Sequence, residues 1–460
     1  MTEKEISINE ALQIGIDKQN KGDFSGAEII YKAILEKIPQ NTDALHLLGL
    51  VKYQTGESKK AIELIEKAVS IRGDIAIFHG NLGMVYDSIG DEEKSIREFE
   101  RALSLNPNYE GAWRAYYNLG IYYSSIGEIE KALENYNKSI NLKKDFAEAY
   151  WNRALVLLLL GKYEEGFNDY EYRFKKEKPS DSRVFEKPKW NGEDLNDKKI
   201  LVITEQGAGD NFQFMRYLKL IKEKHENCKI LLECQKELLN LFKSFDEIDE
   251  IVEKDKNKIP NVDFDYYTHL MSLPVVFGTN LDNIPLKNKY INVNKKVVKK
   301  FENLFDKNKF NIGIVWAGNP KQENDKNRSM KFENIKELGK VEGIQVYSLQ
   351  KGEIVKEIDF SNKEIIDLSE KMKDYEDTAG IIENLDLIIS VDTSVSHLSG
   401  ALGKETWTLL TKIPDWRYLL EGEKCIWYDS MRLFRQKEKG DWKSVIKNVK
   451  EELGKIIVNR

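Results

Sequence analysis

The stretch Leu387–Gly403 combines an apolar run with residues that can bind an anion. Leu387–Val391 predicts a strand that is buried on both faces of a parallel sheet. Asp392–Ser394 follows it, and each of these three residues is a good helix N-cap. Hydroxyls and backbone N–H groups at a helix start, at the carboxyl end of a strand, predict a phosphate site. His397 lies one turn into the predicted helix.

A second strand–turn–helix pattern begins at Lys199–Thr204. This apolar run leads into Glu205–Asp210, a turn with two glycines and two acidic residues, and a helix with one apolar face follows. Glycines allow a ligand to approach the backbone closely, whereas acidic side chains disfavour phosphate. A carboxylate at Asp210 suits a different task, which is to accept the proton of a reacting hydroxyl group.

Two further strand ends carry polar or aromatic side chains. The expected strand Phe310–Trp316 leads into a polar loop, and the expected strand Gln345–Leu349 leads into Gln350. Ligands of open parallel sheets bind at the carboxyl ends of strands, so we expect these ends to share one crevice with Asp392–His397. Arg328, in the loop after the first of these strands, could neutralise a diphosphate through its planar guanidinium.

Each of these groups also has an ordinary structural interpretation. Asp210 and Asp392–Ser394 could simply cap helices, because such caps are common. His397 could be a packed histidine and Arg328 a solvated loop arginine. The residue types alone leave both interpretations open.

The elements that must position these residues alternate between strands and helices, which predicts two parallel, doubly wound sheets. A helix at Lys295–Phe305 bridges them, and a helix at Asp441–Leu453 lies near the end of the chain. The expected strands are 199–204, 229–233, 251–252 and 264–267 in the first sheet, and 310–316, 345–349, 365–368, 387–391 and 406–410 in the second.

The first third of the chain repeats with a period of 34 residues, seen in Gly15, Gly49 and Gly83. Together with small and apolar residues in register, this period is that of the tetratricopeptide repeat, a helix–turn–helix unit. A fourth unit centres on Gly120, and a weaker fifth runs from Glu148 to about residue 174. Such units stack into a superhelix whose concave groove binds proteins or peptides. Candidates for the groove, with packing between helices as the alternative for any one tyrosine, are Tyr53, Tyr86, Tyr116, Tyr117, Asn118, Tyr122 and Tyr123.

Composition excludes several classes of protein. The 71 Lys and Arg residues against 77 Asp and Glu give a net charge of −6, which does not suggest a nucleic-acid binder. The three cysteines form no CxxC pair or disulfide framework, and the polar N-terminus is not a secretory signal. The apolar run Ala154–Leu160 is too short to span a bilayer. We therefore expect a cytoplasmic protein with no membrane span and no zinc site.

These patterns predict four parts. The tetratricopeptide array covers 1–175, a linker 176–197, a first α/β domain 198–305 and a second α/β domain 306–460 that ends in a helix. Trp190 is expected to anchor the linker against the first α/β domain.

The motifs and their order carry a family resemblance. Two α/β domains in tandem with a terminal helix look like the GT-B glycosyltransferase architecture, made of an acceptor domain followed by a nucleotide-sugar domain. EQGAGDNFQFMRYL at Glu205–Leu218, IVWAGNP at Ile314–Pro320 and SVDTSVSHLSGALG at Ser390–Gly403 resemble the heptosyltransferase-like family 9 glycosyltransferases. The segment Pro414–Trp442 is similar to the ending of bacterial proteins that join tetratricopeptide repeats to such a domain.

The resemblance implies roles for individual residues. Asp210 falls on the general base of these enzymes. Ser394 stands where the family often has Gly or Ala, and the family's usual Lys-x-Trp-Pro is absent near Arg328. The expected donor-binding residues are Trp316, Asn319, Arg328, Gln350, Asp392, Thr393, Ser394 and His397, and those expected on the acceptor side are Glu205, Gln206 and Gly209.

These observations favour an inverting glycosyltransferase that moves a sugar from a nucleotide-sugar to an acceptor hydroxyl. Since a repeat array precedes the transferase, the favoured acceptor is Ser or Thr of a protein, as in flagellin glycosyltransferases. No metal or cofactor besides the donor is expected, because a helix start and Arg328 already offer positive charge to the phosphates. Two alternatives stay open: an enzyme that glycosylates lipopolysaccharide or another envelope glycan, and a non-catalytic repeat scaffold.

Overall fold

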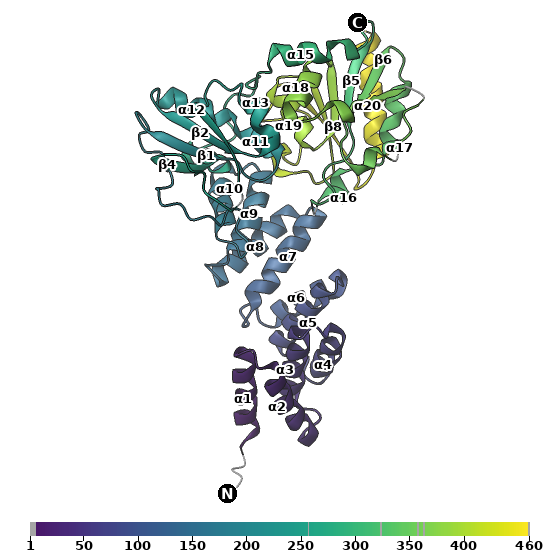
Figure 1. The fold of residues 1–460 in the computed structure, drawn as a ribbon. Helices are drawn as coiled ribbons and strands as arrows, with labels where there is room; N and C mark the ends of the chain where they lie inside the picture. Colours follow the sequence, from purple (N-terminus) through teal and green to yellow (C-terminus); the bar gives the residue numbers. More distant parts are fainter. Residues whose placement is uncertain (1–5, 256, 323, 357, 362–363, 459–460) are drawn as a thin grey trace. The chain divides into compact units, whose positions relative to one another are not determined.

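The computed structural model describes residues 6–458 apart from 256, 323, 357 and 362–363. The chain divides into two compact units, Met1–Val156 and Leu157–Arg460, and the dividing point falls inside helix α9 (Ala147–Leu159). The first unit consists of paired helices and the second contains two β-sheets (Figure 1). Tetratricopeptide repeats had been expected as far as residue 175, so the expected fifth repeat spans this dividing point.

The helices of the first unit form antiparallel pairs whose contact points are set by glycines. An ideal Cβ at Gly15 would lie 2.4 Å from the Tyr31 ring, and one at Gly83 would lie 2.8 Å from the Phe99 ring. Only glycine permits this approach, which confirms the 34-residue register. The helices are α1 (Ile8–Asn20), α2 (Phe24–Lys37), α3 (Thr42–Gln54), α4 (Ser58–Ile71), α5 (Ala76–Ser88), α6 (Glu92–Leu105), α7 (Ala112–Ile126) and α8 (Ile129–Leu142).

A buried histidine makes this unit sensitive to acid. His46 in α3 lies with its ring 4.5 Å from that of Phe78, and its Nε2 accepts a 2.8 Å hydrogen bond from Asn81 Nδ2. Burial lowers the pKa of His46 from 6.5 to about 4. The unfolded chain therefore binds this proton near pH 6.5, whereas the folded chain resists it until near pH 4.

We expect the repeat unit to lose about 2 kcal/mol of stability from this group between pH 7 and pH 5. His46→Gln keeps an acceptor for Asn81 but does not titrate, so this loss should disappear in the variant. Amide hydrogen exchange of α3–α5 at the two pH values measures the difference. An equal pH dependence in the variant and the wild type would contradict the assignment.

The second unit contains a four-stranded parallel sheet in the order β3-β2-β1-β4. Its strands are β1 (Lys199–Ile203), β2 (Lys229–Cys234), β3 (Glu250–Glu253) and β4 (Tyr266–His269). Its helices are α10 (Tyr163–Tyr170), η1 (Glu171–Phe174), α11 (Ala208–Phe214), α12 (Arg216–Lys224), η2 (Lys236–Leu238), α13 (Leu239–Phe242), η3 (Leu270–Ser272) and α14 (Leu273–Val276).

A six-stranded parallel sheet follows in the order β10-β9-β8-β5-β6-β7. Its strands are β5 (Phe310–Val315), β6 (Ile344–Ser348), β7 (Ile365–Asp367), β8 (Leu387–Val391), β9 (Thr406–Leu410) and β10 (Met431–Arg435). Its helices are α15 (Lys295–Phe301), η4 (Glu302–Leu304), α16 (Asp325–Arg328), α17 (Phe332–Ile335), η5 (Lys336–Lys340), η6 (Glu353–Val355), η7 (Ser369–Lys371), α18 (Tyr375–Glu383), α19 (Ser394–Ala401), η8 (Trp416–Tyr418) and α20 (Trp442–Val458).

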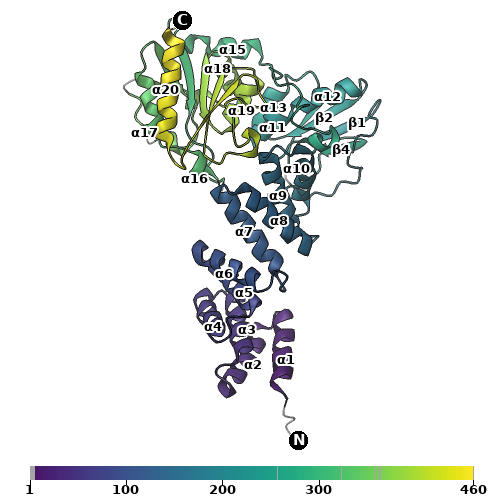
Figure 2. The same cartoon turned by 180° about the vertical axis from the view of Figure 1, so that it is seen from behind.

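The observed architecture confirms the expected class, a helical repeat solenoid followed by a region with two parallel α/β sheets. All five residues of β8 are buried, as expected for a central strand. Helix α20 covers one face of the second sheet, where Val445, Val449 and Leu453 join the core with Ile314 (Figure 2). Among the residues that the structure describes, none of the helices has the length and apolar character needed to cross a bilayer.

The segment before β1 is attached to the first sheet. Lys189 forms a parallel bridge with Tyr267 of β4, and the Trp190 N–H donates to the Tyr267 carbonyl at 2.8 Å. The Trp190 side chain is fully buried, with its ring 6.0 Å from that of Phe277. Trp190 therefore anchors this segment, as the sequence predicted.

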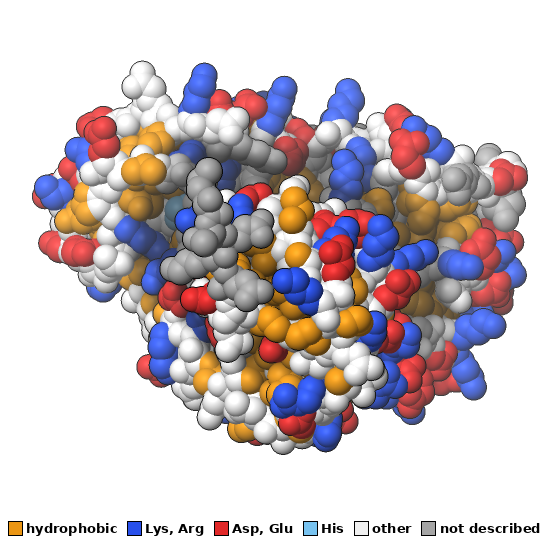
Figure 3. Space-filling model, turned by 90° about the horizontal axis from the view of Figure 1, so that it is seen from below, with side chains coloured by type: hydrophobic (Ala, Val, Ile, Leu, Met, Phe, Trp, Pro, Cys, Tyr) orange, Lys and Arg blue, Asp and Glu red, His pale blue; other side chains and the backbone are white. Residues whose placement is uncertain are grey.

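The surface mixes charges of both signs. On the face drawn in Figure 3, Lys and Arg side chains are interspersed with Asp and Glu among the described residues. This distribution agrees with the near balance of 71 basic and 77 acidic residues.

Candidate functional site

The two turns that the sequence singled out lie against each other. Helix α11 begins after β1 and helix α19 begins after β8, each at the carboxyl end of its parallel strand. An ideal Cβ at Gly209 would lie 3.3 Å from Ser394 Cα and 2.9 Å from His397 Cδ2. The absence of a side chain at Gly209 therefore lets the two helix starts touch, and it brings residues of both sheets into one place.

Asp210 sits at this junction with both carboxylate oxygens engaged. Its Oδ2 accepts a 2.8 Å hydrogen bond from the Gly207 N–H, and its Oδ1 accepts from Nη2 of Arg417 in η8. The side chain is 18% exposed, so it stays within reach of a ligand. The carboxylate is thus held by the backbone of its own turn and by Arg417, which follows β9 of the six-stranded sheet.

Arg417 was not foreseen from the sequence. Its Nη1 donates to Asp415 Oδ1 at 2.8 Å and its Nε to Gln213 Oε1 at 2.6 Å. The guanidinium lies 4.3 Å from the centroid of the Trp416 ring. Burial lowers the pKa of Arg417, but Asp415 and Asp210 together raise it well above its usual value, so the group stays charged. Sequence spacing gave no signal for this contact.

Asp392, His397 and Tyr418 form a second polar group beside the first. The Tyr418 hydroxyl donates to Asp392 Oδ1 at 2.8 Å, and His397 Nε2 lies 3.6 Å from the same oxygen. His397 Nδ1 lies 3.1 Å from the hydroxyl of Tyr428. Burial raises the pKa of the Asp392 carboxyl, but His397, the Arg328 charge and the Tyr418 hydroxyl lower it below its ordinary value. His397 thus has a hydroxyl partner at each ring nitrogen, Tyr428 at Nδ1 and Tyr418 at Nε2, the latter 3.4 Å away.

None of the described side chains caps the first turn of α19. Thr393 holds the N-cap position, but its Oγ1 lies 2.9 Å from Ser390 Oγ and caps none of the helix N–H groups. Ser394 Oγ lies 3.0 Å from the hydroxyl of Tyr375. The partial positive charge of this helix start is therefore not offset by a side-chain cap.

Arg328 lies over the end of β5 and the end of β8. Its Nη1 donates to the Asp392 carbonyl at 3.1 Å and its Nε to Asp325 Oδ1 at 3.2 Å. An ideal Cβ at Gly318 would lie 2.4 Å from Arg328 Nη2, so the guanidinium packs directly on the backbone there. Its side chain is 17% exposed. This places a cation beside the strand end that leads into α19.

The other expected donor-side residues differ in their surroundings. Gln350 is buried, and its Oε1 accepts from the N–H groups of Trp316 and Ala317 at 3.1 and 2.9 Å. It therefore ties the end of β6 to the end of β5. Trp316 is fully buried, and within the described part of the chain its indole Nε1 has no hydrogen-bond partner. Asn319 is exposed, and its side chain accepts from the Lys321 N–H at 3.1 Å.

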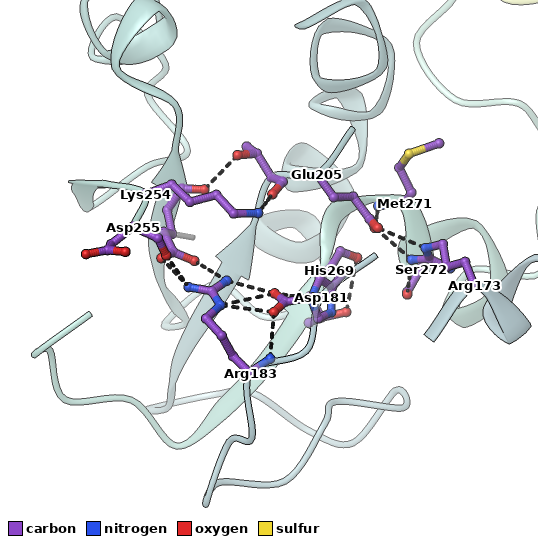
Figure 4. Close-up of polar contacts among 12 residues, drawn as sticks. Arg173, Asp181, Arg183, Glu205, Lys254, Asp255, His269, Met271 and Ser272 are labelled. Carbon is purple, nitrogen blue, oxygen red and sulfur yellow. Dashed lines mark hydrogen bonds and ion pairs between the residues drawn. The ribbon is translucent and has the colours of Figure 1, made fainter. Parts of the chain in front are cut away.

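Glu205, expected on the acceptor side, is buried in an ion pair. Its two carboxylate oxygens accept from Nε and Nη2 of Arg173 at 2.8 and 2.7 Å, and one of them also accepts from the Met271 N–H (Figure 4). Burial raises the pKa of Glu205, but Arg173 lowers it below its ordinary value. The carboxylate therefore holds η1 against the turn. Gln206 is exposed, has a positive φ of 57°, and donates from Nε2 to the Tyr170 hydroxyl at 2.6 Å.

A second cluster of buried charges lies at the carboxyl edge of the same sheet (Figure 4). Arg183 donates to Glu233 Oε1 at 2.7 Å and to Asp181 Oδ2 at 2.8 Å. Nε2 of His269, the last residue of β4, lies 3.0 Å from the same Asp181 oxygen. These pairs fix the segment before Trp190 to the ends of two strands, β2 and β4, which explains the course of this segment.

The family models match only the N-terminal part of the chain, whereas one relative matches most of its length. Tetratricopeptide repeat models match residues 42–75, 74–145 and 117–182. Protein FlbA of Caulobacter vibrioides is 26% identical over 437 residues, which cover 89% of this chain and 72% of FlbA. A TPR repeat-containing protein of Methanocaldococcus jannaschii is 29% identical over 102 residues, 22% of this chain and 18% of that protein.

Among solved structures, the crystal structure of MamA is 34% identical over 35% of this chain and 91% of its own chain, with a TM-score of 0.30. Tetratricopeptide arrays act as surfaces for proteins and peptides. The N-terminal region of the chain contains tetratricopeptide repeats, and through most of its length the chain is similar to FlbA.

Proposed function

We propose that the protein is an inverting glycosyltransferase of the GT-B type. The hydroxyl oxygen of the acceptor attacks the anomeric carbon of a nucleotide-sugar, and the bond from that carbon to the diphosphate oxygen breaks. The electron pair leaves with the nucleoside diphosphate, and the acceptor proton passes to Asp210. The observation that carries this proposal is the contact between the starts of α11 and α19, which brings the Asp210 carboxylate to an uncapped helix start.

The donor would be held by the second half of the unit. Arg328 and the first-turn N–H groups of α19 offer positive charge where a leaving diphosphate needs it. Thr393, Ser394 and His397 line this region from the same turn and helix, and Gln350 and Trp316 support the neighbouring strand end. Binding would therefore depend on Arg328 more than on the buried residues behind it.

We propose a protein acceptor, modified on Ser or Thr, that the repeat array recruits. The tetratricopeptide repeats support this choice, and flagellin is one candidate. The three unpaired cysteines agree with a cytoplasmic site of action. Modification of a glycan by the wild-type protein, with no modification of protein, would favour the envelope enzyme instead.

Thermal unfolding in the presence of UDP, GDP, ADP and TDP tests the donor site. We expect one of these nucleotides to raise the melting temperature of the wild-type protein. Arg328→Gln should remove most of this shift, because a charge-assisted contact to phosphate contributes about 1.5–3 kcal/mol. Arg432→Gln is the matched control, since Arg432 pairs with Glu452 and Glu423. If the nucleotide raised the melting temperature of Arg328→Gln as much as that of Arg432→Gln, Arg328 would not be a donor-binding residue.

Gly318→Ala tests the same site without deleting a charge. The new Cβ would fall 2.4 Å from Arg328 Nη2 and 2.5 Å from Asp325 Oδ1, so the guanidinium must move. We expect affinity for the nucleotide identified above to fall about tenfold, which corresponds to about 1.4 kcal/mol. Gly454→Ala should leave the affinity unchanged, because outside the backbone of its own helix the new Cβ would meet none of the described residues within 4 Å. Isothermal titration measures both, and an unchanged affinity in Gly318→Ala would contradict the placement.

A further inference from the structure

The contact between Asp210 and Arg417 crosses from the first sheet's helix α11 to η8 of the second half of the unit. Arg417 is 7% exposed, so its charge is almost completely removed from water. A buried charge of this kind is costly unless it is fully hydrogen-bonded. A gain in stability alone therefore does not explain why a charged arginine is buried at this position.

The guanidinium is held in place without the help of Asp210. Nη1 and the backbone N–H of Arg417 both donate to Asp415 Oδ1, at 2.8 and 3.0 Å, and Nε donates to Gln213 Oε1. The ring of Trp416 covers one face of the group. Three of its sides are therefore fixed, and Nη2 projects toward Asp210.

Gln213 holds the Arg417 guanidinium at the cost of one of its own hydrogen bonds. The residue is fully buried, and its Oε1 accepts from Arg417, while its Nε2 finds no hydrogen-bond partner among the residues that the structure describes. An unpartnered buried amide group costs about 1–3 kcal/mol. The backbone after Arg417 is also strained, because Leu419 has a positive φ of 55°. Such costs collect at functional sites.

Resting on the proposed function, we propose that Arg417 is a positioning residue that aims the Asp210 carboxylate at the acceptor hydroxyl. Arg417 holds Oδ1 while the Gly207 N–H holds Oδ2, so the plane of the carboxylate is fixed by two bonds from opposite sides. Arg417 lies in η8, which follows a strand of the six-stranded sheet where the donor would bind. The contact with Asp210 therefore also fixes the distance between the base and the anomeric carbon of the donor. Arg417 itself contacts neither substrate.

The test uses the nucleotide-sugar that the full-length wild-type protein turns over fastest, chosen from UDP-, GDP-, ADP- and TDP-linked sugars. The measurement is release of nucleoside diphosphate, with water taking the place of the acceptor hydroxyl, so that the sugar is hydrolysed and the proton of the water passes to Asp210. We expect Arg417→Gln to lower kcat about a hundredfold, because a displacement of about 1 Å at a reacting group can cost that much, with little change in the donor KM. Arg417→Lys, which keeps the charge but loses the fork, should recover part of the rate.

A double variant separates positioning from general structural support. In the Asp210→Asn background, Arg417→Gln should change the rate by less than about twofold, since the two residues act as one unit. If Arg417→Gln folds poorly, Asp415→Asn provides the second variant. This variant replaces a charged partner of the guanidinium by a neutral amide whose Oδ1 still accepts, so it should lower kcat less than Arg417→Gln does.

Two results would overturn this inference while leaving the proposed function intact. A raised donor KM with an unchanged kcat would make Arg417 a phosphate ligand. A wild-type rate in well-folded Arg417→Gln would make the pair merely structural. Failure of the wild-type protein to turn over any of the donors would instead count against the proposed function.

Discussion

Asp210→Asn should lower the rate of sugar transfer about a thousandfold, since a positioned general base contributes about 10²–10⁴. Asparagine matches the shape of aspartate, and its Oδ1 can still accept from Arg417, whereas its Nδ2 cannot accept from the Gly207 N–H. The contact of Gly209 with Ser394 and His397 does not involve this side chain, so the junction between α11 and α19 should persist. The ability to take the acceptor proton is lost. Affinity for the nucleoside diphosphate should therefore stay within about twofold, a split that separates chemistry from binding.

Asp441→Asn is the matched control for this substitution. Asp441 accepts from the Ser444 N–H at 3.1 Å near the start of α20, so it lies on an element that only covers the sheet. Steady-state release of nucleoside diphosphate measures the rates, and isothermal titration measures the affinity. Normal turnover in Asp210→Asn would show that another group accepts the proton.

The second large effect is on stability. Arg173→Met should lower the free energy of unfolding of the second unit by about 3–5 kcal/mol. Arg173 is fully buried and lies between Glu205 and Glu171, at 2.7 and 2.5 Å. Its removal leaves the buried Glu205 carboxylate without its counter-charge. Urea unfolding at pH 7, followed by tryptophan fluorescence, measures the loss.

A double variant and a surface control test whether the loss of stability comes from the buried Glu205 charge. Arg173→Met with Glu205→Gln should be less destabilised than Arg173→Met alone, because the uncompensated charge is gone. Lys199→Met should cost less than about 1 kcal/mol, since Lys199 pairs with an exposed Asp263. A loss in Arg173→Met no larger than that of Lys199→Met would contradict the role assigned to the buried pair.

Local patterns foretold much of the fold. The 34-residue glycine spacing predicted the repeats because a glycine packs on a side chain of the following helix in successive pairs, at Gly15, Gly49 and Gly83. The apolar run Leu387–Val391 predicted a central strand because a parallel strand is buried on both faces. Strand β10 was missed, since Arg432 and Arg435 interrupt its apolar pattern on an edge of the sheet.

The side-chain partners at the candidate site could not be read in the same way. Arg417 meets Asp210 across 207 residues of sequence, and no periodicity connects them. Glu205 looked like a free acidic group in a glycine turn, yet Arg173 of η1 engages both of its carboxylate oxygens. Such contacts depend on how the second unit packs, whereas strand–turn–helix patterns depend on neighbouring residues alone.

The most direct measurement of the central claim is the release of nucleoside diphosphate when the full-length wild-type protein is incubated with UDP-, GDP-, ADP- and TDP-linked sugars. The account predicts that at least one donor is consumed, and that Asp210→Asn nearly abolishes its consumption while still binding the nucleotide. Consumption of none of them, together with no thermal shift by any nucleotide, would contradict the claim that the junction of α11 and α19 is a transferase site.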